Sequence, residues 1–311
     1  MSVITWVGLG RMGLPMALQI AGAGHEVRGV EINPVAAREA EMAGISIYSS
    51  AVEAIEGADA VVTMLPTGAH VRELLAGPTG LFSVASRTTL FVDSSTIDID
   101  SAKELHVLAE ARELKFVDAP VSGGVVKAAA GTLTFMIGGS EESFAAASSI
   151  VAPMAAKIVY AGGPSTGQAA KIVNNLILGI CLAGTCEGLL LGERLGLDAD
   201  VFYDIAVSSS AENFALREWY PAPGVVSSAP SSHEYAPGFT SALLHKDLSL
   251  ALQAGQSTGT ALDTARTVHA LFEQLVDSGA GGYDCTALLP ALDGRLGSAA
   301  ASVPAADAAT R

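Results

Sequence analysis

One face of an apolar stretch carries a lysine and two asparagines. In GQAAKIVNNLILG, residues 167–179, Lys171, Asn174 and Asn175 follow the i, i+3, i+4 spacing that brings side chains together on one side of a helix. The other side carries Ala170, Val173, Ile177 and Ile180. Burial in apolar surroundings lowers the pKa of a lysine from its ordinary ~10.4, so Lys171 could accept a proton from an alcohol. A lysine whose stem is buried and whose head reaches water explains the pattern equally well.

A second chemical pattern lies near the N-terminus, where a short β-branched run leads into GLGRMG, residues 8–13. The three glycines stand between a predicted strand and a predicted helix, and Glu31 follows at about the ~20-residue spacing of a dinucleotide site. In that interpretation Gly8 allows the tight turn, Gly10 lets the backbone approach a pyrophosphate, and Gly13 lets helix and strand pack closely. The helix then offers its N-terminal amides to the phosphates.

Glu31 also bears on which dinucleotide is bound. A carboxylate at the end of the second strand accepts hydrogen bonds from the adenosine ribose, whereas it repels the 2′-phosphate of NADP. We therefore expect NAD as the cofactor, with NADP favoured only if Arg28 or Arg38 reaches the phosphate pocket.

A third pattern is the stretch DAPVSGG, residues 118–124, which leaves another predicted strand and turns through Ser122, Gly123 and Gly124. Backbone amides without side chains, together with a hydroxyl, form a concave set of donors that suits a carboxylate. The stretch by itself fits a purely structural glycine turn equally well.

These residues need a scaffold, and the hydrophobic pattern predicts one. Short β-branched runs alternate with helical stretches over the first half of the chain, as in a doubly wound α/β domain. The predicted strands are 3–8, 26–32, 60–65, 89–95, 115–120, 134–139 and 157–162. From about Ser165 the strands stop and helix-period segments follow. We therefore expect an NAD-binding domain at 1–164, a helical substrate and dimerisation domain at 165–297, and a frayed tail at 298–311.

Composition narrows the class of protein and of partner. The 311 residues exceed the ~150 of a typical domain, and the net charge of −15 argues against nucleic acid and anionic membranes as partners. The most apolar stretch, 176–191, is interrupted by Glu187 and is shorter than the ~20 residues that span a bilayer. The first strand begins too early to leave room for a signal peptide. We therefore expect a cytoplasmic protein. The content of 50% hydrophobic residues indicates buried helices and a subunit interface, so we also expect a homodimer or homotetramer.

Four stretches occur together in a fixed order: VGLGRMGLPMA, DAPVSGG, GQAAKIVNN and KDLSLA. Their order and spacing closely resemble the β-hydroxyacid dehydrogenase family, and the resemblance covers nearly the whole chain. It implies an α/β fold in which an N-terminal Rossmann-like dinucleotide-binding domain is followed by an all-α domain, the two joined by a long helix. It also implies that Lys171 is catalytic with Asn175 beside it. The substrate-binding residues that it implies are Ser122, Gly123, Gly124 and Asn174.

The glycine pattern and the same resemblance give the residues expected to contact the cofactor. They are Gly8, Leu9, Gly10, Arg11, Met12, Gly13, Glu31, Asn33, Met64, Leu65, Pro66, Thr96 and Lys246. In the reaction implied, hydride passes from the alcohol carbon to nicotinamide while Lys171 takes the hydroxyl proton, and the ammonium returns that proton in the reverse direction. Histidines and cysteines show no zinc-type spacing, so we expect no metal.

The segment EWYPAPGVVSSAPSSHEYAPGF, residues 218–239, bears on the substrate. Its prolines, glycines and serines exclude a regular helix and predict a long ordered loop. The segment resembles the corresponding loop of those family members that act on a methyl-bearing acid, and the resemblance implies NAD-dependent oxidation of 3-hydroxyisobutyrate. Apolar side chains such as Trp219 and Tyr220 agree with such a substrate. The alternative for this segment is that it only packs the domain or a subunit interface. The alternatives for the protein are a reductase of tartronate semialdehyde, of another small aldehyde or of an imine, and a cofactor-binding regulatory module without turnover.

Overall fold

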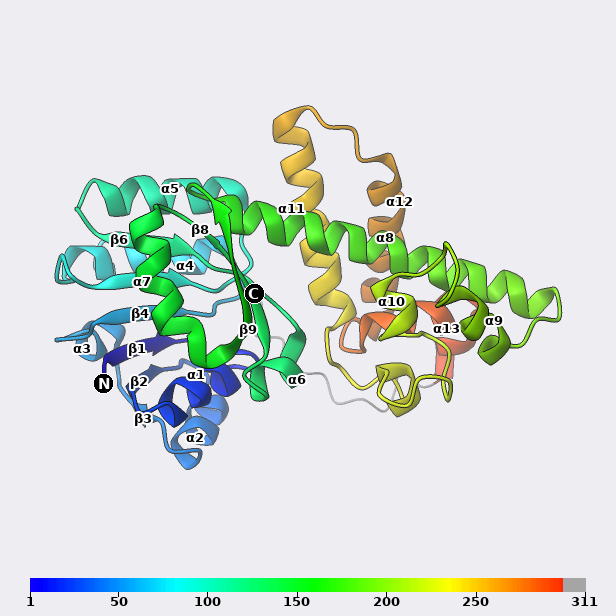
Figure 1. Ribbon diagram of the computed structural model, residues 1–311, viewed down its shortest axis with the longest axis horizontal. Helices are drawn as coiled ribbons and strands as arrows, with labels where there is room; N and C mark the ends of the chain where they lie inside the picture. Colours follow the sequence, from blue (N-terminus) through cyan, green and yellow to red (C-terminus); the bar gives the residue numbers. More distant parts are fainter. Residues whose placement is uncertain (299–311) are drawn as a thin grey trace. The chain divides into compact units, whose positions relative to one another are not determined.

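The computed structural model describes Met1–Ser298, so the predicted frayed tail lies, apart from its first residue, outside the described residues. The chain forms two compact units, one ending at Lys171 and the other beginning at Ile172. The division falls inside one helix, α8 (Thr166–Arg194), drawn in green in Figure 1. The predicted domain boundary, between residues 164 and 165, lies just before this helix begins.

A nine-stranded sheet forms the first unit, in the order β3-β2-β1-β4-β5-β6-β8-β7 with β9 paired to β8. The strands are β1 (Val3–Val7), β2 (Glu26–Val30), β3 (Ser46–Ile47), β4 (Ala60–Thr63), β5 (Leu90–Asp93), β6 (Lys115–Asp118), β7 (Val121–Ser122), β8 (Leu133–Gly138) and β9 (Ala155–Gly162). The pairs from β3 across to β6 are parallel, whereas β8 runs antiparallel to β6 and β7. All seven predicted strands are present, and the two missed ones, β3 and β7, are two residues each.

Helices cover both faces of this sheet, as the doubly wound pattern predicts (Figure 1). They are α1 (Gly13–Gly22), α2 (Pro34–Met42), α3 (Ala51–Ala54), α4 (Gly68–Ala76), α5 (Ile99–Glu110), α6 (Gly124–Ala129) and α7 (Glu141–Val151). Alternate strand residues serve the two faces: Val62 on β4 shares a core with Met16 of α1, and its neighbour Val61 shares a core with Leu105 of α5. The carboxyl ends of the parallel strands are therefore held rigidly.

The second unit is helical, and its described residues contain no strand beyond a single bridge between Thr240 and Asp284. Besides most of α8 it contains α9 (Ala199–Ala206), α10 (Phe214–Arg217), α11 (Ser241–Thr258), α12 (Asp263–Leu275) and α13 (Leu288–Leu292). Leu182 of α8, Leu244 of α11 and Phe272 of α12 lie in one buried cluster. Packing of these apolar faces holds the unit together.

The segment 218–239 is irregular, as predicted, and its one short element is a 3₁₀ turn at Pro230–His233. One expectation about it is wrong. Tyr220 is fully buried in the core of the second unit and donates its hydroxyl proton to the Ala199 carbonyl at 2.6 Å, so it does not line a substrate pocket. Trp219 is half-buried, with its ring 5.5 Å from that of Phe214.

Helix α8 is longer than its most apolar stretch suggests. It has 29 residues, and by length and composition alone it could cross a membrane, with a mean hydropathy of 1.6 in its most apolar window. The expectation that this stretch is too short to span rested on residues 176–191, and the helix begins at Thr166. Within the protein, 44% of that window is buried.

Candidate active site

The glycine turn after β1 is shaped by its neighbours. Gly8 has φ of +92°, and a Cβ there would collide with the backbone oxygen of Met64, so only glycine fits. A Cβ at Gly13 would collide with the Gly8 carbonyl, to which the buried indole of Trp6 donates a hydrogen bond of 3.0 Å. A Cβ at Gly10, by contrast, meets nothing within 4 Å. Two glycines are thus required by packing, and the third leaves an open surface over the turn.

The N-terminus of α1 opens at this turn. The residue before the helix, Met12, makes no side-chain cap, and Arg11 beside it is exposed. The N–H of Leu14 donates to the Gly10 carbonyl at 3.0 Å, and Pro15 has no N–H, but the first turn of α1 carries no acidic side chain. Open space at Gly10 and the positive end of this helix dipole together fit the pyrophosphate of a dinucleotide.

Glu31 ties two loops together. The N–H of Leu9, in the glycine turn, donates to Glu31 Oε2 at 2.7 Å, and the N–H of Asn33 donates to Oε1 at 2.8 Å. Asn33 in turn caps α2 by accepting from the N–H of Val35 at 2.9 Å. The predicted ribose acceptor is therefore fixed by the loops on both sides of the predicted nucleotide position.

Arg28 and Arg38, the two arginines that could favour NADP over NAD, have different surroundings. Arg28 donates to Glu26 at 2.7 Å and to the Glu56 carbonyl at 2.6 Å, and its guanidinium lies over the Tyr48 ring. The hydrogen bond that Arg28 donates to Glu26 raises the pKa of Arg28. Arg38 is exposed on α2. Arg28 is thus engaged away from Glu31.

The predicted cofactor residues after β4 and β5 are joined by hydrogen bonds. The N–H of Met64 donates to the Val7 carbonyl at 2.9 Å, and that of Leu65 donates to Ser95 Oγ at 2.8 Å. Ser95 directly precedes Thr96, and Pro66 is exposed beside Leu65. The loops that follow β1, β4 and β5 are therefore linked at the carboxyl edge of the sheet.

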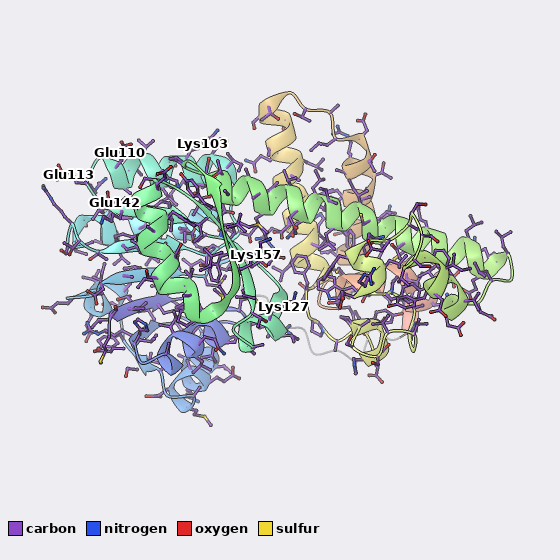
Figure 2. All side chains as sticks on the ribbon, in the orientation of Figure 1. Lys103, Glu110, Glu113, Lys127, Glu142 and Lys157 are labelled. Atoms are coloured by element: carbon purple, nitrogen blue, oxygen red, sulfur yellow. The ribbon has the colours of Figure 1, made fainter. Side chains whose placement is uncertain are left out.

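The turn at Ser122, Gly123 and Gly124 joins β7 to α6 and lies in the first unit. Gly123 has φ of +138°, and all three residues are partly exposed. No side chain caps the start of α6. Lys127, labelled in Figure 2, is exposed one turn further along α6 and adds a cation near these donors. The turn predicted to bind a carboxylate is thus partly exposed and lies at a helix start without a side-chain cap.

Near its start, helix α8 buries polar side chains and exposes apolar ones beside them, although Asn174 is exposed and Ile172 is buried. Lys171 is 8% exposed and Asn175 is 2% exposed, whereas Val173 is 53% and Ile177 is 56% exposed. The predicted burial of Lys171 is therefore confirmed, whereas Val173 and Ile177 on the apolar side are exposed. Burying an amine and an amide costs free energy unless they form hydrogen bonds or ion pairs. The burial of Lys171 and Asn175 therefore makes this part of α8 a candidate site.

Asn174 and Asn175 differ in their surroundings. Asn174 is exposed and donates to Asn175 Oδ1 at 3.0 Å. Asn175 donates through Nδ2 to Asp247 on α11 at 2.5 Å, and the other oxygen of Asp247 lies 3.3 Å from Lys246 Nζ. The predicted residues Asn175 and Lys246 are therefore brought together in the second unit by an aspartate that sequence reasoning missed.

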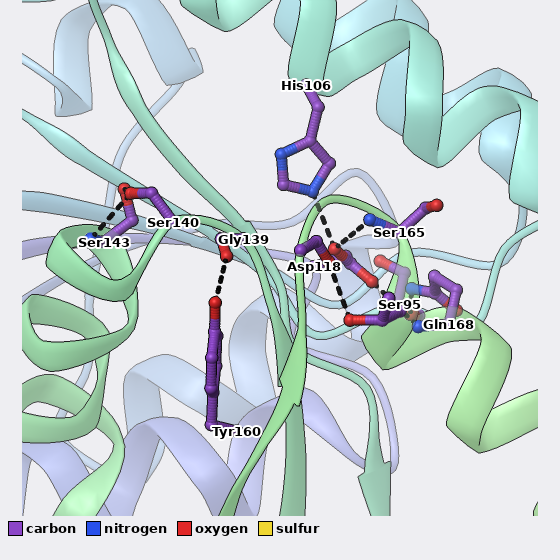
Figure 3. Close-up of polar contacts among 11 residues, drawn as sticks. Ser95, His106, Asp118, Gly139, Ser140, Ser143, Tyr160, Ser165 and Gln168 are labelled. Carbon is purple, nitrogen blue, oxygen red and sulfur yellow. Dashed lines mark hydrogen bonds and ion pairs between the residues drawn. The ribbon is translucent and has the colours of Figure 1, made fainter.

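A buried network in the first unit, drawn in Figure 3, was also missed. Asp118, at the end of β6, accepts from His106 Nε2 at 2.7 Å and from the N–H groups of Ser165 at 2.9 Å and Gln168 at 2.8 Å. The side chain of Gln168 then reaches the loop after β5. The signal was available in DAPVSGG and GQAAK, because both residues belong to those stretches.

A second buried acid, Asp93, lies beside Asp118 in the sheet register. It accepts from Thr63 Oγ1 at 2.7 Å and from the N–H of Ser95 at 3.1 Å, both through Oδ1. Its Oδ2 is buried without a hydrogen-bond partner among the residues that the structure describes. Burial raises the pKa of Asp93 to about 6. This carboxyl therefore sits at the carboxyl edge of the sheet with its charge poorly compensated.

The predicted residues divide between the units. Lys171, the substrate-carboxylate turn and most of the cofactor residues lie in the first unit, whereas Asn174, Asn175 and Lys246 lie in the second. In the part of the chain up to Ser298, no group of three or more His, Cys, Asp or Glu side chains could hold a metal ion.

Comparison with protein families divides the chain in a similar way. Residues 3–162 match the NAD binding domain of 6-phosphogluconate dehydrogenase. Residues 165–292 match a model described as NAD-binding of NADP-dependent 3-hydroxyisobutyrate dehydrogenase.

Individual relatives extend the similarity over most of the chain. A probable 3-hydroxyisobutyrate dehydrogenase of Mycobacterium tuberculosis is 43% identical over 259 residues, which is 83% of this chain and 87% of that protein. An NAD-dependent L-serine dehydrogenase of Pseudomonas aeruginosa is 39% identical, covering 90% of this chain and 94% of the relative. The solved structure of Mycobacterium tuberculosis 3-hydroxyisobutyrate dehydrogenase with L-serine has a TM-score of 0.88 at 39% identity, covering 94% and 99% of the two chains. The chain thus belongs to the β-hydroxyacid dehydrogenase family, as an oxidoreductase with an NAD(P)-binding Rossmann-like domain.

Proposed function

We propose that the protein oxidises 3-hydroxyisobutyrate to methylmalonate semialdehyde with NAD. The observation that carries the proposal is the pattern of burial at the start of helix α8, which buries Lys171 and Asn175 while it exposes Val173 and Ile177. A buried amine in a hydroxyacid dehydrogenase suits proton transfer, because burial favours the neutral form that can accept a proton. A cofactor-binding regulatory module would have no need for this arrangement.

Each residue then has a distinct task in the reaction. Ser122 and the amides of Gly123 and Gly124 bind the substrate carboxylate. The neutral amine of Lys171 takes the hydroxyl proton, and Asn175, held by Asp247, orients the hydroxyl. Bound nicotinamide supplies the hydride acceptor. In the reverse direction the Lys171 ammonium returns the proton to the developing alkoxide.

We infer that NAD is preferred to NADP. Both oxygens of Glu31 already accept backbone hydrogen bonds, which fixes the carboxylate where it repels a 2′-phosphate. Arg28, one of the two candidates for neutralising such a phosphate, is paired with Glu26. The residues proposed to hold the cofactor are the glycine turn, Glu31, Asn33, Met64 to Pro66, Thr96 and Lys246.

A second substrate, L-serine, is favoured by two relatives: the Pseudomonas protein named for it and the mycobacterial structure that contains it. Serine and 3-hydroxyisobutyrate share the carboxylate and the 3-hydroxyl and differ at C2, where an ammonium replaces a methyl. A methyl group in an apolar pocket contributes only ~1 to 3 kcal/mol, so 3-hydroxypropionate should react with lower efficiency.

The test is a comparison of kcat/KM by nicotinamide absorbance for 3-hydroxyisobutyrate, L-serine, 3-hydroxypropionate and glycerate, each with NAD and with NADP. The proposal expects 3-hydroxyisobutyrate with NAD to give the highest value. A higher value for L-serine would assign the second candidate, and a higher value for glycerate would contradict both.

We further propose that the protein is a cytoplasmic homodimer or homotetramer, without nucleic-acid or membrane partners. One side of α8 in the second unit exposes Val173, Ile177 and Leu191, and a Cβ at Gly184 on the same helix would meet nothing within 4 Å. An apolar stripe with room for close approach suits a second copy of the chain. Light scattering behind size-exclusion chromatography tests this, and a monomer at micromolar concentration would contradict it.

A further inference from the structure

The first turn of α8 is anchored by a residue far away in the sequence. Ser165, which precedes the helix, has φ of +66°, and its N–H donates to Asp118 Oδ1 at 2.9 Å. The N–H of Gln168 donates to Asp118 Oδ2 at 2.8 Å. Asp118 is fully buried at the end of β6, so its carboxylate caps the helix from the sheet. The start of α8 is thereby fixed to the carboxyl edge.

Gln168 makes a second connection with its side chain. Its Nε2 donates to the Ser95 carbonyl at 2.7 Å, and its Oε1 accepts from the N–H of Ile97 at 3.1 Å. The two bonds flank Thr96, and Gln168 is fully buried. A primary amide is needed here, because it donates and accepts at once without carrying a charge.

Lys171 follows Gln168 by three residues and therefore lies on the same side of α8. The segment 95–97 in turn is joined to the loop after β4, because Ser95 Oγ accepts from the N–H of Leu65. One side chain thus links the helical turn before the buried amine to the loop of the proposed cofactor residue Thr96.

We propose that Gln168 is a positioning residue, which holds the turn of α8 that carries Lys171 in register with the segment 95–97. The inference rests on the proposed role of Lys171 in proton transfer. It goes further in stating that the amine works only while the Gln168 amide bridges Ser95 and Ile97. A displacement of about 1 Å at such a site lowers turnover by up to ~10²-fold, so loss of the bridge should be visible in kcat.

The experiment compares two variants of Gln168 with a matched control in the full-length protein. Gln168→Leu keeps the volume and removes both bonds. Gln168→Glu keeps the acceptor and regains the donor only when its carboxyl is protonated. The control is Thr89→Val, which removes another buried bond from a side chain to a distant carbonyl, Thr89 Oγ1 to Ala58 O at 3.1 Å, at the opposite end of β5.

Gln168→Leu should lower kcat by roughly 10-fold or more with substrate KM within about 3-fold, whereas Thr89→Val should keep kcat within about 2-fold. The ratio of Gln168→Glu to wild-type activity, measured in the aldehyde-reducing direction, should rise as pH falls from about 8 to about 6 and the buried carboxyl gains its proton. A purely structural role would not produce this pH-dependent rescue.

Amide hydrogen exchange supplies a readout that does not depend on turnover. The N–H of Ile97 should exchange faster in Gln168→Leu than in wild type or Thr89→Val. If the N–H of Ile97 exchanges faster in Gln168→Leu but Lys171→Ala keeps wild-type turnover, the bridge exists and the proposed function of Lys171 is wrong. The inference is overturned if folded Gln168→Leu keeps wild-type kcat, or if the activity ratio of Gln168→Glu is flat with pH. If Gln168→Leu does not fold, the pH dependence of Gln168→Glu decides.

Discussion

Asn175 donates a hydrogen bond of 2.5 Å to Asp247, a carboxylate that is 2% exposed and whose other oxygen faces Lys246. Asp247 therefore orients two residues that we assign to the reaction. Removing it leaves a buried amide proton unpaired, which costs ~1 to 3 kcal/mol.

Asp247→Ala should accordingly lower kcat/KM by roughly 10-fold or more, and Asp247→Asn should lower it less, because the amide keeps an acceptor for Asn175. Steady-state kinetics with 3-hydroxyisobutyrate measure the effect. The control is Asp263→Ala on α12, whose contact with Arg266 is exposed. Equal activity of Asp247→Ala and wild type would remove Asp247 from the site.

Lys171→Ala should lower turnover by roughly 10²-fold or more, the usual contribution of a positioned acid or base, while NAD affinity stays within about 2-fold. Lys171→Arg should be equally impaired in the oxidative direction, because a guanidinium does not give up its proton. Kinetics and calorimetric titration with NAD separate the two effects. Lys157→Ala, at an exposed lysine on β9 labelled in Figure 2, is the control. More than a tenth of wild-type turnover in Lys171→Ala would show that the role is misassigned.

Glu31→Gln should weaken NAD binding by roughly 10-fold and narrow the preference over NADP, because one charged acceptor is lost and one repulsion is removed. Dissociation constants for both dinucleotides, from calorimetry, test this against Glu39→Gln, an exposed position on α2. If the wild-type protein binds NADP more tightly than NAD, the proposed role of Glu31 is wrong and Arg38 becomes the residue to test.

Asp93 should make stability depend on pH. Its pKa is raised to about 6 by burial, whereas the ordinary value is 3.8, so between these values the folded protein holds a proton that the unfolded chain has released. Stability from this group therefore falls as pH rises from about 4 to about 6, by about 3 kcal/mol in all. Asp93→Asn removes that dependence, so its melting temperature relative to wild type should increase over this range. A difference in melting temperature that stays constant with pH would contradict the assignment.

Local patterns in the sequence predicted the elements that periodicity and turn chemistry control. The glycine turn, the doubly wound sheet and the helical second half follow from alternating apolar residues, Gly-rich turns and helix-period segments. Strands β3 and β7 escaped because two residues show no period.

Long-range contacts account for what the sequence did not predict. Asp118 meets Gln168 across 50 residues and Asn175 meets Asp247 across 72, and no local pattern encodes such pairs. The exposure of Val173 and Ile177 on the apolar side of α8 likewise depends on how the whole chain packs, and the local pattern does not encode it. Tyr220 was misjudged because packing of the helices in the second unit, and not loop composition, decides its burial.

The chain contains two tryptophans, and each unit holds one of them. Trp6 is fully buried and its indole donates a hydrogen bond to the Gly8 carbonyl, so we expect its fluorescence to respond to changes in the glycine turn. Trp219 sits among Phe214 and Phe239 in the helical unit. A Trp219→Phe variant would leave Trp6 as a single intrinsic emitter at the nucleotide turn, and a Trp6→Phe variant would leave an emitter for the helical unit alone. The two proteins would separate nucleotide binding from helical-unit unfolding by emission, without any attached dye.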